Sequence, residues 1–108
     1  DNTVIDLSNL ITEELVVRSH PSATNALLVD FIFSNESSSE QLFPLAELNF
    51  TNIGGEIIAN RVFDRTEYLP PEMQLFTHMP AHSSIQVSLE LADPGDDATG
   101  YALVFRNP

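Results

Sequence analysis

The sequence predicts an all-β domain with the architecture of an immunoglobulin-like antiparallel β-sandwich of about seven strands. First, apolar and polar side chains alternate through most of the chain, as they do in strands with one buried and one wet face. Second, glycine, proline and short polar runs separate these stretches at the spacing typical of sandwiches. Third, helical spacing is convincing nowhere in the sequence. A small closed barrel is the alternative architecture.

The alternation defines the strands in order. The first long strand stops at the segment SHPSATN, where Pro21 holds His20 in extended geometry. The later predicted strands are ALLVDFIFSN (26–35), LAELNFTN (45–52), IIANRVF (57–63), SSIQVSLELA (83–92) and GYALVFRN (100–107). The stretch 83–92 alternates most cleanly, and the last stretch places Tyr101, Leu103 and Phe105 on one side.

The breaks between these strands carry turn chemistry. The segment NIGGE supplies two glycines where a tight hairpin needs positive φ. Pro94 and Gly95 occupy the middle positions expected of a type II turn. The run TEYLPPEMQLF has room for one short helical turn.

Length and composition bound the organisation of the chain. We expect residues 10–108 to form a single domain and residues 1–9 to be a tether or linker, because 108 residues supply one core. The chain has no cysteine, which excludes disulfides, thiolate metal sites and thiol nucleophiles.

Charge restricts the partners. The formal net charge is −12, from sixteen carboxylates against four arginines. A field of this sign repels phosphate backbones and anionic headgroups, so we expect neither nucleic-acid binding nor direct membrane insertion. A strongly solvated surface is the simpler interpretation of this acidity, and an acidic face for a basic partner is the other.

An ordered set of landmarks runs through the chain from about residue 15 onward. Its members are His20-Pro21, Ala26-Leu27, Asn35, Gln41, Phe43-Pro44, Glu47-Leu48, Gly55, Ala59, Arg61, Phe63 and Glu67-Tyr68-Leu69, followed by the tail LELADPGDDATGYALVF. No single motif is specific, but the ordered set resembles a proteobacterial domain of unknown function, which lies at the C-terminal end of zinc-ribbon, single-pass membrane proteins.

The resemblance implies a cellular location but no activity. It places this domain on the periplasmic face of the bacterial inner membrane, with residues 1–9 leaving the membrane and any zinc in a segment outside this chain. Two departures stand out. Asp64 occupies a position where a small residue or proline is expected, and residues 71–83 are apolar where relatives carry a Gly/Pro-rich linker.

Two features are candidate interaction sites. Arg61 and Arg65 have carboxylates close by in sequence, and we favour a scaffold role for them over a two-arginine anion clamp. The segment 71–83 is rich in flexible apolar side chains, which either extend the core or form an exposed lip for a partner. Those side chains are Met73, Leu75, Phe76 and Met79.

Other candidate sites are weaker. His78 and His82 have the spacing of a metal-binding pair, but Pro80 stands between them and a third ligand is missing. The aspartates of 93–97 lack the residue order of a calcium loop. The triplets at Asn35 and Asn49 fit the glycosylation pattern but arise often by chance.

We therefore expect a non-catalytic extracytoplasmic interaction or structural module, without a cofactor or metal in this segment. Its partner is expected to be a protein of the cell envelope, accepted at a free edge strand. The alternative function is small-ligand or peptide binding by the segment 71–83 and the neighbouring arginines.

Overall fold

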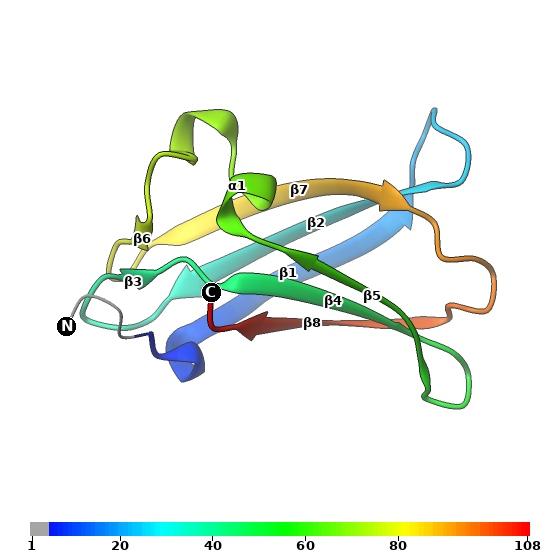
Figure 1. The fold of residues 1–108 in the computed structure, drawn as a ribbon, viewed down its shortest axis with the longest axis horizontal. Helices are drawn as coiled ribbons and strands as arrows, with labels where there is room; N and C mark the ends of the chain where they lie inside the picture. The colour runs from blue at the N-terminus through cyan, green and yellow to red at the C-terminus, as the bar shows by residue number, and fades with distance from the viewer. Residues whose placement is uncertain (1–4) are drawn as a thin grey trace.

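The computed structural model describes residues 5–108 and places eight strands in three antiparallel sheets (Figure 1). The first main sheet has the order β1 (Leu10–Ser19), β2 (Ala26–Asn35), β7 (Ser84–Ala92). The second has the order β5 (Ile57–Phe63), β4 (Leu45–Thr51), β8 (Gly100–Arg106). The predicted antiparallel all-β class is confirmed.

The remaining elements are short. β3 (Gln41–Leu42) and β6 (His78–Met79) form a two-stranded sheet of their own. The helical pieces are η1 (Leu7–Asn9), α1 (Arg65–Tyr68) and η2 (Pro71–Met73). Within residues 5–108, no helix has the length and hydropathy needed to span a membrane.

The predicted N-terminal tether, residues 1–9, lies only partly within the described residues. Residues 1–4 of the predicted tether lie outside them. In the remaining part, Ile5 and Leu7 pack against the core, and the side chain of Asp6 accepts a bond from the N–H of Ser8.

The core lies between the two main sheets. Alternate side chains of β2, β4 and β7 point inward and are almost completely buried, whereas those between them stay at least partly accessible, except Ser34 near the end of β2. Each large apolar side chain buried in this way contributes about 1.5–3 kcal/mol to stability. Phe33 sits at the centre, with its ring 4.8 Å from that of Phe105 and 6.0 Å from that of Tyr68.

The buried side chain of Asn35 joins separate parts of the chain at one end of the sandwich. Its Oδ1 accepts a hydrogen bond from Nε2 of Gln41 at 2.8 Å, and Oε1 of Gln41 accepts from the backbone N–H of Asp6. Its Nδ2 donates to three backbone carbonyls, those of Ser39, Met79 and Pro80. One amide therefore fixes the end of β2 against both the N-terminal segment and β6.

The side chain of Tyr68 is a second buried group with a hydrogen-bonded polar atom. Asp64 is the N-cap of α1, with Glu67 completing a capping box, so the departure at position 64 begins a helical turn. This turn presents Tyr68 to the core, where its hydroxyl donates to the carbonyl of Pro44 at 2.8 Å. Burial raises the pKa of the Tyr68 phenol well above its ordinary value.

The turn predictions agree with the backbone in part: one of the two hairpin glycines, Gly55, has positive φ, and the hydrogen-bonded turn of the 93–99 loop runs from Gly95 to Ala98 instead of being centred on Pro94 and Gly95. Gly55 has φ 84° and Gly95 has φ 110°, conformations that side chains with a Cβ rarely adopt. His20 holds the turn that follows β1, because its Nδ1 accepts from the N–H groups of Ser22 and Ala23. Its Nε2 lies 2.8 Å from a carboxylate oxygen of Glu90 on β7.

We predict that Asn35→Ala lowers the free energy of unfolding by about 3 kcal/mol, because it leaves several buried polar groups without partners. Asn60→Ala is the matched control, since Asn60 bonds only exposed side chains in the described structure, and about 0.5 kcal/mol or less is expected. Urea denaturation measures both. Equal losses in the two variants would contradict the role given to Asn35.

We predict an alkaline loss of stability that depends on Tyr68. The folded pKa is raised, so its stabilising effect is complete below the unfolded pKa of about 10. Above that pH the unfolded phenol ionises first, and stability falls by at most about 1.4 kcal/mol per pH unit from this group. Denaturation between pH 8 and about 11 should show a shallower fall in Tyr68→Phe than in the parent chain. An unchanged slope would contradict the buried, protonated phenol.

Candidate functional site

Arg65 holds the segment that follows α1. Its Nη1 donates to the carbonyl oxygens of Gln74 at 2.5 Å and Phe76 at 3.2 Å. This geometry closes the loop between α1 and β6 onto the first residue of the helix. Arg65 therefore acts on backbone carbonyls, not on the carboxylates close to it in sequence.

Arg61 lies elsewhere and has a different environment. It pairs in register with the buried Leu48, so it occupies the inward-facing side of the edge strand β5. Its Nη1 donates to the neighbouring carbonyl of Asn60 at 3.0 Å. Glu47 of the neighbouring strand β4 binds Arg106, and this hydrogen bond and that from Asn60 hold the pKa of its carboxyl below the ordinary value.

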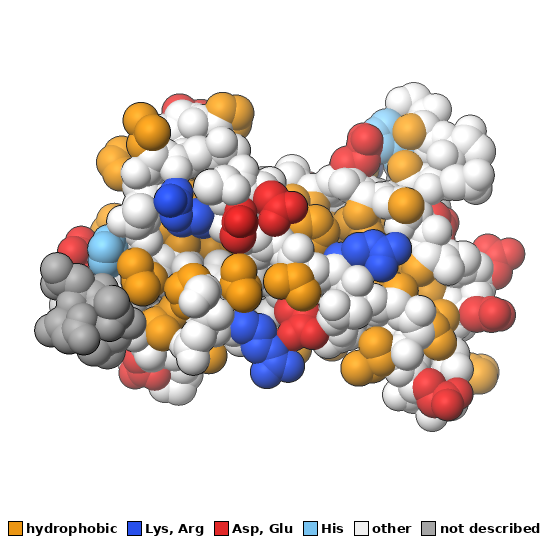
Figure 2. Space-filling view, viewed as in Figure 1, with side chains coloured by type: hydrophobic (Ala, Val, Ile, Leu, Met, Phe, Trp, Pro, Cys, Tyr) orange, Lys and Arg blue, Asp and Glu red, His pale blue; other side chains and the backbone are white. Residues whose placement is uncertain are grey.

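The arginines do not converge on a single anion site. On the face drawn in Figure 2, the basic side chains lie apart from one another. No described salt bridge includes Arg61 or Arg65 within residues 5–108. The geometry gives each arginine a separate local role.

The segment 71–83 divides into a buried and an exposed part. Met79 is completely buried, and Met73 packs against the core. Leu75 and Phe76 remain exposed, at 92% and 58% of their surface. The lip predicted for this segment therefore consists of these two residues, at the projection between α1 and β6 in Figure 1.

A hollow of about 490 Å³ lies near this lip. Its walls come from the start of β4, from α1 and from the residue after Phe76. The lining residues include Phe43, Pro44, Arg65 and Thr77. The hollow offers apolar walls, the Arg65 cation and the Asp64 carboxylate, and the Nη1 group of Arg65 is already bonded to two carbonyls.

The polar clusters singled out in the sequence stay dispersed. Among the described residues, no three His, Cys, Asp or Glu side chains lie close enough together to hold a metal ion. His78 is hydrogen-bonded to Thr77. The side chain of Asn35 is buried and bonded, so the glycosylation triplet there is inaccessible in the folded chain.

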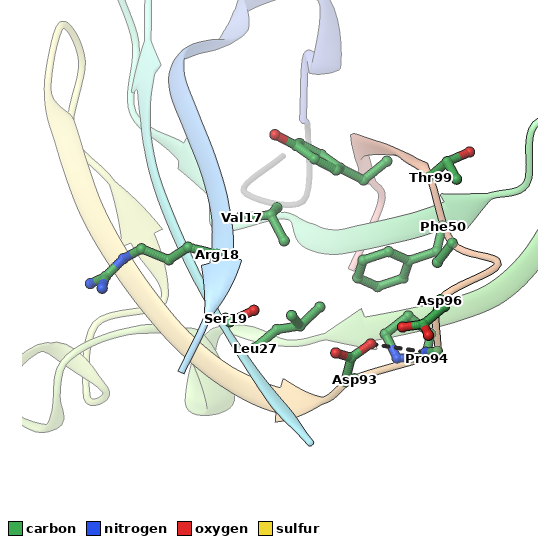
Figure 3. Close-up of a pocket in the computed structure, with 12 residues that line it drawn as sticks. Val17, Arg18, Ser19, Leu27, Phe50, Asp93, Pro94, Asp96 and Thr99 are labelled. Carbon is green, nitrogen blue, oxygen red and sulfur yellow. Dashed lines mark hydrogen bonds between the residues drawn. The ribbon is translucent and has the colours of Figure 1, made fainter. Parts of the chain in front are cut away.

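Sequence reasoning missed a hollow of about 350 Å³ between the edges of the two main sheets. Val17 and Leu27 project from the first sheet toward Phe50 of the second (Figure 3). Tyr101 of β8 also lines the hollow. β1 and β8 do not pair with each other in the described structure. We call this space, with the flanking inward side chains of β1 and β8, the β1–β8 groove.

The inward side chains of this groove are less buried than those of the central strands. Leu15 and Val17 of β1 are partly accessible, as are Leu103 and Phe105 of β8. Tyr101 lies on the same face as these residues, as the alternation predicted. Its side chain is nevertheless 45% exposed, so it is only partly buried in the core. The alternation in 100–106 was visible in the sequence, but the missing neighbour of β8 was not.

The charge at the groove is negative at one end. Arg18 lines it but points away from the hollow and lies 3.6 Å from Asp30 (Figure 3). Asp93 and Asp96 lie at the opposite wall, in the loop between β7 and β8. Asp93 accepts a bond from the N–H of Gly95, which fixes this turn at the end of the groove.

We predict that Arg65→Gln lowers the free energy of unfolding by about 1–2 kcal/mol, because a charged donor to two carbonyls is lost. Arg61→Gln should cost about 0.5 kcal/mol or less, since its one bond is local and partly exposed. Thermal unfolding gives the ranking, and amide exchange of residues 70–77 should rise only in Arg65→Gln. Unchanged stability in both variants would contradict the scaffold role.

Comparison with known proteins identifies the family. The model of the family described as "Protein of unknown function (DUF3426)" matches residues 7–105. A search of curated proteins found no match. Among solved structures, a DUF1425 family member from Shewanella sp. pv-4 is similar in fold, with a TM-score of 0.53 at 10% sequence identity. The similarity covers 92% of this chain and 78% of that one.

These matches support the expectation of a domain of unknown function, and its zinc-ribbon and membrane context stays a prediction. Because the family model matches residues 7–105, the chain belongs to the DUF3426 family of proteins of unknown function.

Proposed function

We propose that this domain is a non-catalytic protein-interaction module on the periplasmic side of a membrane-anchored zinc-ribbon protein. The observation that carries the interaction role is the free edge strand β8, which pairs only with β4 in the described structure. It borders a partly exposed groove whose walls are apolar toward the core and polar at the rim. Unpaired backbone groups on such an edge are available to a partner strand.

The chemistry of the landmark residues supports a role as a scaffold. His20, Asn35 and Tyr68 all make hydrogen bonds to backbone groups of the same chain. The residues that carry the family resemblance thus hold turns and connections in place. The surfaces left for function are the sheet edges and the exposed loops.

Ligand or peptide binding at the lip is the second candidate function. The exposed Leu75 and Phe76, beside the hollow at Arg65 and Thr77, favour it. Its geometry suits an apolar group rather than an anion, because Arg65 already serves two carbonyls.

The interaction role is tested by affinity capture from bacterial envelope extracts with the domain as bait. We expect a protein that is retained at moderate salt and is absent with a charge-matched acidic control protein. The variant Leu75→Ser/Phe76→Ser distinguishes the β8 edge from the lip. If this variant no longer captured the partner, the interaction would be assigned to the lip. Recovery of nothing above the control would contradict the interaction role.

The location is tested separately with the full-length natural protein. An alkaline phosphatase fused after this domain is active only outside the cytoplasm, so we expect activity from the fusion. A fusion that is produced in full but inactive would contradict the periplasmic location.

A further inference from the structure

We infer that β8 accepts an extended segment of another protein, with apolar side chains at alternate positions and lysine or arginine near its end at Asp93 and Asp96. This inference rests on the proposed interaction function and names its site and the chemistry of its partner. The added segment would lie along β8, and every second side chain would enter the β1–β8 groove.

β8 is selected because the other edges of the main sheets carry features that oppose strand addition. β1 has a register shift between Thr12 and Glu14, and β5 has one opposite Phe50 and Thr51. β5 also turns Arg61 inward, and a charge there disfavours an added strand. The edge of β7 is flanked by α1 and presents polar side chains.

β8 has none of these features in the described structure. Its register with β4 runs without a shift from Arg106, opposite Leu45, to Gly100, opposite Thr51. Its sequence, GYALVFR, is uncharged until the last residue. Alternate backbone N–H and C=O groups of an edge strand point away from its single neighbour, so a regular ladder can be continued.

The groove supplies contacts for the side chains of an added strand. Leu15 and Val17 on one side, and Leu103 and Phe105 on the other, are only partly buried although they face inward. The hollow of about 350 Å³ beside Val17, Phe50 and Tyr101 has room for an apolar side chain. Covering these groups with apolar side chains removes apolar surface from water, which favours binding.

Charge determines which partner fits. Arg18 is directed away from the groove and lies near Asp30, so the uncompensated charges at this end are those of Asp93 and Asp96. The whole chain has a formal charge of −12, which opposes a second copy or an acidic segment. A cationic segment gains attraction both at long range and at the rim.

The test uses the 108-residue chain and a fluorescent peptide of alternating valine and lysine, seven residues long like β8. One control peptide has glutamate in place of lysine, and others carry N-methyl groups on alternate backbone nitrogens to block the ladder. Peptides with the two possible N-methylation patterns are both used, since only one pattern faces β8. Fluorescence anisotropy at low salt measures affinity, and amide exchange by NMR locates the bound peptide.

Two charge variants are matched. Asp93→Asn/Asp96→Asn removes two charges from the groove, and Glu40→Gln/Glu72→Gln removes two exposed charges elsewhere. We expect the first to weaken the lysine peptide about fivefold and the second by about twofold or less, as exposed ion pairs contribute modestly. The glutamate peptide and one N-methylated peptide should not bind. When the lysine peptide binds, the amides of β8 should become more protected from hydrogen exchange.

Several results would overturn the inference. These are equal binding of the glutamate peptide, equal weakening by both charge variants, protection at another edge, and no binding at all. Protection of β8 that rises with protein concentration alone would assign the edge to a second copy. If both Asp93→Asn/Asp96→Asn and Tyr101→Arg captured a natural partner as well as the parent domain does, the proposed interaction function would stand. The assignment of the binding site to β8 would then be wrong.

Discussion

Two three-stranded sheets that pack face to face without closing into a barrel leave four strand edges, and the structure depends on how each edge is managed. Register shifts lie at β1 and β5, α1 flanks β7, and Arg61 adds an inward charge to β5. Within residues 5–108, β8 continues in regular register without such features. One edge therefore differs from the other three in being open to a further strand.

Much of the fold could be predicted because strand alternation is a local property. The buried faces of 26–35, 45–51 and 84–92 follow directly from their apolar period of two. Turns with glycine at positive φ were predictable for the same reason, as Gly55 and Gly95 illustrate. The buried roles of Asn35 and Tyr68 were less accessible. The carbonyls of Met79 and Pro80 lie 44 and 45 residues from Asn35, and that of Pro44 lies 24 residues from Tyr68.

The candidate site was predicted only in part. The apolar residues of the segment 71–83 look alike in the sequence, but Leu75 and Phe76 are exposed and Met79 is buried. Met79 is buried because it belongs to β6, which pairs with β3. The β1–β8 groove depends on which strands lack a neighbour. That property belongs to the topology and cannot be derived from the alternation of Tyr101, Leu103 and Phe105 alone.

Amide hydrogen exchange of the free monomer tests the central claim most directly. If β8 is an open edge, alternate amides along Gly100–Arg106 should exchange rapidly, whereas the amides of the central strand β4 should be protected throughout. Uniform protection of β8 in dilute, monomeric protein would contradict the account, because it would mean that the edge is already covered.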